Sequence, residues 1–211
     1  MVTPKSATDS KQALLDASLE VFAEKGLEGS TVKDIADAAG VNVALISYYF
    51  GSKDGLYKAA LASSGQTRLD AADRVLKPVD SPEELKIRLK LFLEEFIHCH
   101  YQNTCVMKII HRDFDGQHPI ALESFRGIFQ DMYVKVTGFI EDAKSKGIMR
   151  ADVDAGCFVS VLFGGLIHSL RMDFLRKEFI GTSFTDPKFA NLFIDQFIRN
   201  LCEGSFPRST T

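Results

Sequence analysis

Two short helices joined by a tight turn are predicted over residues 31–50, and this stretch constrains the chain more than any other. The spacing of Thr31 and Asp34 is typical of a capping box, which starts a helix. Gly40 can adopt the left-handed conformation that ends that helix, and Asn42 is a good N-cap for the next one. We therefore expect a helix-turn-helix unit here.

The second of these helices carries more side chains than its packing requires. Leu45, Ile46 and Phe50 suffice to hold it inward, and two adjacent tyrosines remain outside. Tyrosine hydroxyls can bond phosphates or base edges, and small apolar side chains suit thymine methyl groups. The helix is therefore predicted to enter a major groove of DNA, although a plain pair of helices inside an all-α protein would share its periodicity. The residues left outside are Val43, Ala44, Ser47, Tyr48 and Tyr49.

Helical signals dominate the rest of the chain, so the predicted fold class is all-α with about nine helices. We expect an N-terminal three-helix domain over residues 8–68 and a larger C-terminal helical domain over residues 78–205. Within the first domain, the buried face of the second helix is predicted to hold Val32, Ile35, Ala36 and Ala39. Later helices are expected over 81–102, 105–112, 119–146, 154–179 and 187–203, with a disordered tail after them.

Composition excludes several classes of protein. The 211 residues contain no 20-residue apolar run that could span a membrane, and the polar N-terminus lacks a secretory signal. The four cysteines show no CxxC pairing, which favours reduced thiols in the cytoplasm. The first 56 residues hold five lysines against eight acidic residues, so the predicted DNA-binding part has a net charge of −3.

Residues 10–57 resemble the N-terminal domain of the TetR family of transcriptional regulators, and the spacing agrees without a gap. The residues that carry the resemblance are Ala17, Phe22, Gly26, Thr31, Ile35, Ala36, Ala39, Gly40, Val41, Ile46, Tyr48, Tyr49, Phe50, Lys53 and Leu56. The run from Asn42 to Lys53 further resembles the CecR-like subgroup of drug-responsive repressors.

The resemblance implies a homodimer that binds a palindromic double-stranded DNA operator. It implies base contacts from Val43, Ala44, Leu45, Ser47 and Tyr48, and phosphate contacts from Thr31, Tyr49 and Lys53. Asn42 at the start of the helix is also predicted to bind DNA. Many family members carry Lys, Arg, Gln or Thr early in this helix, where this chain has valine, alanine and leucine. We therefore expect sparse hydrogen-bond readout, more weight on DNA shape, and a modest dependence of binding on salt.

Two C-terminal helices are unusually apolar. Residues 157–167 are apolar nearly all round, and phenylalanines recur every fourth residue at positions 189, 193 and 197. A helix that is apolar on more than one face needs two surfaces to bury against. We expect the second surface to be the same pair of helices in another copy, with Gly156, Ser160 and Gly164 allowing close approach. A fully internal helix is the alternative.

Four of the five histidines lie within residues 98–118, together with two cysteines and two aspartates. We expect an apolar pocket with a few polar anchors for a small, unidentified, apolar ligand, and the family resemblance places it within residues 81–179. A metal- or redox-sensing site in the His98–His118 cluster is the alternative, although the spacing is poor for chelation and we expect no metal or cofactor. Candidate lining residues are Phe96, His100, Met107, His111, Phe125, Phe129, Tyr133, Phe163 and His168.

Motifs of catalysis are missing from the sequence. It contains no GxSxG, no HExxH and no phosphate-binding glycine loop, so we expect no enzyme activity. The family resemblance implies a ligand-released repressor. A small helical enzyme and a pure interaction module are the alternatives.

Overall fold

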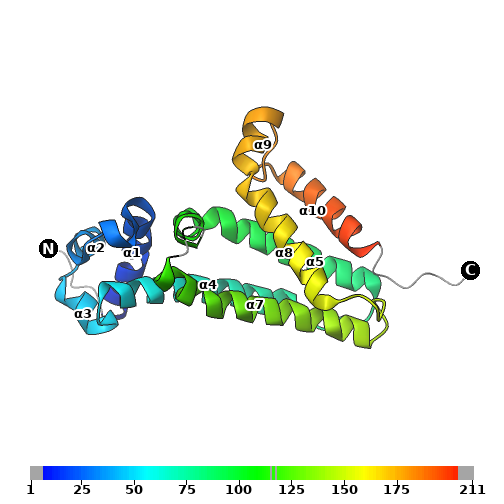
Figure 1. Ribbon diagram of the computed structural model, residues 1–211, viewed down its shortest axis with the longest axis horizontal. Helices are drawn as coiled ribbons and strands as arrows, with labels where there is room; N and C mark the ends of the chain where they lie inside the picture. The colour runs from blue at the N-terminus through cyan, green and yellow to red at the C-terminus, as the bar shows by residue number, and fades with distance from the viewer. Residues whose placement is uncertain (1–6, 115, 117, 204–211) are drawn as a thin grey trace, which may run out of the picture. The chain divides into compact units, whose positions relative to one another are not determined.

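A computed structural model describes residues 7–114, 116 and 118–203. Within these residues the chain forms ten α-helices and one π-helical turn, and no strand (Figure 1). The expected all-α fold is therefore confirmed. The elements are α1 (Ala7–Gly29), α2 (Val32–Ala39), α3 (Ala44–Phe50), α4 (Lys53–Val75), α5 (Pro82–Gln102), α6 (Thr104–Ile109), the π turn η1 (Ile110–Phe114), α7 (Pro119–Ser145), α8 (Ala155–Arg171), α9 (Asp173–Ile180) and α10 (Pro187–Cys202).

The chain divides into two compact units that are each built from two segments. Unit 1 contains residues 1–67 and 103–129, and unit 2 contains residues 68–102 and 130–211. Helices α4 and α7 therefore contribute residues to both units. The predicted domain limits at 8–68 and 78–205 remain predictions, and residues 204 and 205 lie outside the described residues, as does the tail.

Unit 1 has a single apolar core. Phe22 of α1, Ile35 of α2, Ile46 of α3 and Tyr57 of α4 are each at most 1% exposed and belong to it. Three buried residues of the second segment, at positions 106, 109 and 121, complete the same core. The first three helices therefore rest partly on residues that follow them by more than 50 positions in the sequence.

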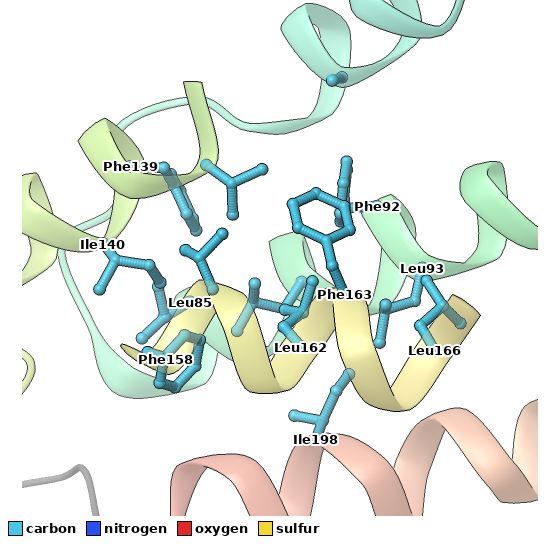
Figure 2. Close-up of a cluster of buried hydrophobic side chains, with 14 of the residues drawn as sticks. Leu85, Phe92, Leu93, Phe139, Ile140, Phe158, Leu162, Phe163, Leu166 and Ile198 are labelled. Atoms are coloured by element: carbon cyan, nitrogen blue, oxygen red, sulfur yellow. The ribbon is translucent and has the colours of Figure 1, made fainter. Parts of the chain in front are cut away.

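Unit 2 is organised around α8. Its side chains at positions 158, 162, 163 and 166 meet residues of α5, α7 and α10 in one cluster (Figure 2). Leu85, Leu93 and Leu162 are fully buried there. This burial accounts for one apolar face of α8, as predicted from its composition.

Local start signals were good predictors of the helices. The hydroxyl of Ser81 accepts a hydrogen bond from the amide of Glu84 at 3.1 Å, at the start of α5. Asp154 accepts one from the amide of Cys157 at 2.7 Å at the start of α8, and Asp186 caps α10 through Lys188 at 3.0 Å. These caps depend on residues two or three positions apart, so the sequence alone can indicate them.

Three expectations were wrong in detail. The helix expected over 154–179 is two helices, α8 and α9, bent by 54° at Met172. The bend follows from Asp173, whose buried carboxylate accepts bonds from the Tyr101 hydroxyl, the Ser183 hydroxyl and the Phe184 amide. Val32 is 37% exposed and does not belong to the buried face of α2.

The third difference concerns the segment after α5, which was expected to be an α-helix over 105–112. Only α6 is α-helical, and the chain continues as the π turn η1. In the described residues, no single helix is both long and apolar enough to cross a membrane, and α8 and α9 meet that test only as a bent pair.

Candidate nucleic-acid interface

Helix α2 begins with the predicted capping box. The Thr31 hydroxyl accepts a hydrogen bond from the Asp34 amide at 3.0 Å, and the Thr31 amide donates to the Asp34 carboxylate at 2.9 Å. The Lys25 ammonium also donates to Asp34 at 2.8 Å. The hydrogen bond from Lys25 and those from Thr31 lower the pKa of Asp34 to about 2. The start of α2 is therefore tied to the end of α1.

The turn between α2 and α3 has the geometry that a helix-turn-helix requires. Gly40 is in the left-handed region with φ 63°, and its amide donates to the Ala36 and Asp37 carbonyls. The small side chains of Ala36 and Ala39 are 2% and 6% exposed, so the two helices can cross closely. Asn42 accepts a hydrogen bond from the Ala44 amide at 2.8 Å, which satisfies one free amide at the start of α3.

Helix α3 separates its buried and exposed residues as predicted except at Tyr49, which was expected to lie outside and is half-buried against the core. Ile46 is 1% exposed, whereas Tyr48 is 79% exposed and Val43 at the helix start is 44% exposed. Ala44 and Ser47 are also exposed, and Leu45 is half-buried. Val43, Ala44, Ser47 and Tyr48 therefore form one open face, and Leu45 packs against the core instead. The tyrosine rings at positions 48 and 49 form an edge-to-face pair with centroids 5.0 Å apart.

The predicted phosphate-contacting residues already have partners within the chain. The Lys53 ammonium donates to the carbonyls of Leu27 at 2.6 Å and Ser30 at 2.9 Å. The Tyr49 hydroxyl donates to the Ala7 carbonyl at 3.2 Å, and the Thr31 hydroxyl belongs to the capping box. A DNA phosphate bound by these three side chains would therefore share their donors with the chain's own acceptors. The amides at the helix N-termini could supply further hydrogen bonds to it.

The predicted ligand-lining residues are divided between the two units. Met107, His111, Phe125 and Phe129 lie in unit 1, and Phe96, His100, Tyr133, Phe163 and His168 lie in unit 2.

Within unit 2, Phe96 and Phe163 come together. Their ring centroids are 6.0 Å apart, and the ring of Phe92 lies 6.2 Å from each. Tyr133 is half-buried, and its hydroxyl donates to the Gly156 carbonyl at 3.0 Å. His168 is exposed near the end of α8, whereas His100 is half-buried and its ring lies 5.2 Å from that of Tyr101. Aromatic rings thus dominate the part of the predicted site that unit 2 contains.

In unit 1, Phe125 is half-buried and packs against the core, whereas Phe129 is 55% exposed. Met107 and His111 are also half-buried. Across the described residues, no three His, Cys, Asp or Glu side chains gather where they could hold a metal ion. Asp115, one of the two aspartates in the histidine-rich stretch, lies outside the described residues.

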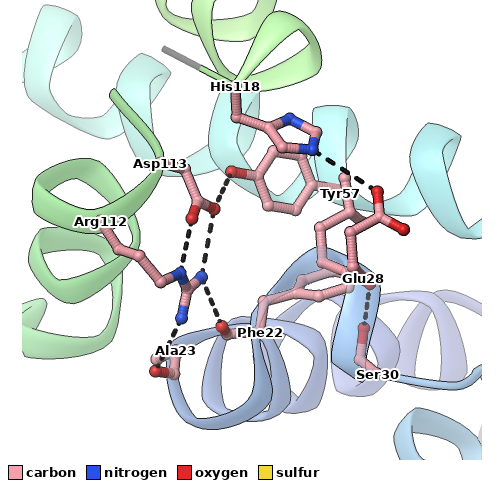
Figure 3. Close-up of polar contacts among 9 residues, drawn as sticks. Phe22, Ala23, Glu28, Ser30, Tyr57, Arg112, Asp113 and His118 are labelled. Carbon is pink, nitrogen blue, oxygen red and sulfur yellow. Dashed lines mark hydrogen bonds and ion pairs between the residues drawn. The ribbon is translucent and has the colours of Figure 1, made fainter. Parts of the chain in front are cut away.

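One polar cluster of unit 1 was missed by the sequence reasoning. Arg112 bonds the backbone of α1, and Asp113 joins Arg112 to Tyr57 of α4 (Figure 3). Asp113 is the other aspartate of the histidine-rich stretch. No local pattern could have indicated these contacts, because they join residues 56 and 90 positions apart.

A helix-turn-helix with one open face, carried on a separate core in an all-helical chain, defines a DNA-binding protein. The family model described as bacterial regulatory proteins of the tetR family matches residues 14–60. RutR of Escherichia coli K12, an HTH-type transcriptional regulator, is 39% identical over 211 residues, covering 97% of this chain and 94% of RutR. NicS of Pseudomonas putida, a transcriptional repressor, is 26% identical over 162 residues, covering 72% of this chain and 71% of NicS.

Solved structures show the same fold. FadR of Bacillus subtilis, in complex with stearoyl-CoA, is 16% identical with a TM-score of 0.75, covering 92% of this chain and 98% of that one. FadR of Bacillus halodurans, a fatty acid degradation regulator, is 17% identical with a TM-score of 0.72, covering 96% of this chain and 98% of that one. The chain belongs to the TetR family of bacterial transcriptional regulators. It is a DNA-binding regulator and not an enzyme.

Proposed function

We propose that this regulator is a repressor that binds a palindromic operator as a homodimer and leaves it when a small ligand binds. The observation that carries the proposal is the open face of α3. Tyr48 is 79% exposed on a helix whose opposite side is anchored by Ile46, at 1% exposed. A large aromatic side chain held outward on a rigid short helix is suited to contact base edges in a major groove.

The readout we infer for this face depends little on charged side chains. Val43 and Ala44 offer methyl groups, Ser47 and Tyr48 offer hydroxyls, and α3 carries no lysine or arginine. Discrimination then comes from thymine methyl contacts, a few hydrogen bonds and the shape of the DNA. Binding should therefore weaken with salt less steeply than in a strongly basic repressor, since each neutralised phosphate contributes about −0.9 to the slope.

Homodimerisation through α8 and α10 is the second part of the proposal. Val161 and Ile167 of α8 are 59% and 37% exposed, and Leu192 of α10 is 59% exposed. Gly164 lies on the exposed side of α8, and a Cβ atom there would meet nothing within 4 Å. These features support a close contact between helices of two copies, which would place two α3 helices on successive major grooves.

The ligand part of the proposal rests on the aromatic residues of unit 2. Phe96 and Phe163 favour an apolar ligand, and the Bacillus subtilis FadR structure holds stearoyl-CoA. Stearoyl-CoA is therefore the first compound to test here. Because the target is bacterial DNA, we place the protein in the cytoplasm. Membership of the CecR-like subgroup stays a prediction from residues 42–53.

Selection of duplexes from a random library by the purified protein tests the proposal. We expect a palindrome whose half-sites are centred about 34 Å apart, the spacing of successive major grooves. The selected duplex should be released by the ligand, with stearoyl-CoA tried first and free CoA as the control. Failure to enrich any sequence, or enrichment of a single unrepeated site, would contradict the proposal.

A further inference from the structure

Helix α1 is interrupted shortly before the helix-turn-helix begins. Gly26 has φ 78° and ψ 168°, far from helical values, although helical turns lie on both sides of it. At such a break the last four carbonyls of the preceding helix lose their regular donors and need others. Phe22 and Ala23 lie in that last turn, only a few residues before Thr31 starts α2. The break therefore lies between the body of α1 and the start of the helix-turn-helix.

Arg112 supplies donors to this turn from the other segment of unit 1. Its Nη2 donates to the Phe22 carbonyl at 2.8 Å and its Nη1 to the Ala23 carbonyl at 3.3 Å (Figure 3). The guanidinium also covers Gly26, since a Cβ atom there would lie 3.6 Å from its Cζ. A cation at the end of a helix interacts favourably with the helix dipole as well as with the carbonyls.

Asp113 fixes the orientation of this arginine and connects it to α4. Its carboxylate accepts bonds from Arg112 Nε at 2.5 Å and Nη2 at 3.1 Å, and a third from the Tyr57 hydroxyl at 2.7 Å. Asp113 is 7% exposed and Tyr57 is fully buried. Burial alone would raise the pKa of Asp113, but the bonds from Arg112 and Tyr57 outweigh it and lower that pKa. The carboxylate is thus held in its charged form.

The other side of the break is held from α4. Lys53 donates to the carbonyls of Leu27 and Ser30, which follow Gly26. The end of α1 is therefore held by one cation from each direction, Arg112 before the break and Lys53 after it. Arg112 stands in the π turn η1, and such turns are frequent at functional sites.

We propose that Arg112, Asp113 and Tyr57 form a clamp that positions the helix-turn-helix for DNA binding and makes its affinity depend on residues 103–129. The clamp joins the backbone of α1 to α4, the two helices between which α2 and α3 lie in the sequence. Residues 103–129 also contain four of the predicted ligand-lining residues, including His111 next to Arg112. A ligand that shifts η1 would therefore loosen the break in α1 and change how α3 meets the groove.

If the clamp changes the affinity of the helix-turn-helix for DNA, then DNA binding must also change the stability of the clamp, because coupling between two sites is reciprocal. Operator binding should tighten the clamp and slow amide exchange in residues 106–113. A contact that served folding alone would change stability without this response. This inference rests on the proposed DNA binding, and its test uses the duplex selected by the unaltered protein.

The test compares Arg112→Gln, Arg112→Lys and Tyr57→Phe with Glu123→Gln. The control removes an exposed ion pair between Lys58 and Glu123, 2.7 Å apart, which joins the same two segments of unit 1. Exposed ion pairs of this kind contribute little to the stability of a folded protein. Dissociation constants for the selected duplex and hydrogen exchange with and without it are the two measurements, and thermal unfolding checks that each variant is folded.

We expect about 10-fold weaker binding for Arg112→Gln and about 3-fold for Tyr57→Phe, because the lost bonds involve charged groups. Arg112→Lys should recover part of the loss, and Glu123→Gln should stay within about 2-fold. The slowing of exchange in residues 106–113 on adding duplex should disappear in Arg112→Gln.

Unchanged or tighter binding in the folded Arg112→Gln and Tyr57→Phe proteins would overturn the clamp, and so would an unaltered exchange response. If Arg112→Gln does not fold, the dissociation constant and exchange response of Tyr57→Phe test the clamp instead, since this change removes one hydroxyl and keeps the buried ring. Failure of the unaltered protein to select any duplex would instead contradict the proposed function.

Discussion

Gly165 of α8 and Phe197 of α10 pack so closely that a Cβ atom on residue 165 would lie 2.7 Å from the phenylalanine ring. The ring of Phe197 is in turn stacked on that of Phe193, at 5.4 Å and 12°. The contact therefore has little room to adjust. At this point α10 packs closely on α8 within one chain.

Gly165→Ala should destabilise the protein, and Gly138→Ala in α7 should not. The first change overpacks the contact with Phe197, which costs about 1–3 kcal/mol, whereas the second enters open space on an exposed helix position and adds a better helix former. For a chain of this size the loss corresponds to a melting temperature lower by roughly 2–12 °C. Thermal unfolding of the two variants measures the difference. Equal melting temperatures would contradict the packing described here.

Val161→Asp should turn the protein into a monomer without unfolding it. Val161 is 59% exposed in the chain, so a change there should alter the free energy of unfolding by at most about 0.5 kcal/mol. In the proposed dimer, however, the two new carboxylates would be buried close to each other at the interface, and their desolvation and repulsion would oppose dimerisation. Sedimentation equilibrium gives the readout, with Val134→Asp as the matched control, since Val134 on α7 is 62% exposed. A dimeric Val161→Asp protein would place the interface elsewhere.

Helix starts were predictable from sequence, because a cap such as Asp154 acts within three residues of itself. The same holds for the left-handed turn at Gly40 and for the open face of α3. The bend at Met172 was not predictable, because it depends on Tyr101 and Ser183 reaching Asp173 from other parts of the chain. The clamp at Arg112 is a tertiary contact of the same kind. Local sequence patterns therefore predict the helix-turn-helix, whereas the tertiary contacts that hold it in place cannot be predicted from them.

Asp173→Ala should destabilise unit 2 by about 3 kcal/mol. The change leaves the buried Ser183 hydroxyl and the Phe184 amide without the carboxylate that now accepts their bonds at 2.6 and 3.1 Å, and unmade bonds of this kind cost about 1–3 kcal/mol each. Urea unfolding measures the effect against Glu178→Ala, an exposed acid on the same helix. A loss no larger than that of the control would mean that Asp173 does not hold the α8–α9 bend.

The Asp34 carboxylate should contribute stability that disappears in acid. Its pKa is lowered from 3.8 to about 2 in the folded protein, so the contribution is fully present above pH 3.8 and is lost as the pH falls toward 2. The difference in melting temperature between the unaltered protein and Asp34→Asn should therefore be constant above about pH 5 and shrink below pH 4. A difference that does not depend on pH would show that the Lys25 and Thr31 contacts do not bias this carboxylate.

The central claim is that the open face of α3 reads DNA, and the affinity of Tyr48→Ala for the selected duplex tests it most directly. Phe179→Ala is the matched control, because Phe179 on α9 is 78% exposed and Tyr48 is 79% exposed. We expect Tyr48→Ala to bind about 10-fold or more weakly, since a base contact is worth about 1–3 kcal/mol, and Phe179→Ala to bind as the unaltered protein does. Unchanged affinity in a folded, dimeric Tyr48→Ala protein would contradict the account.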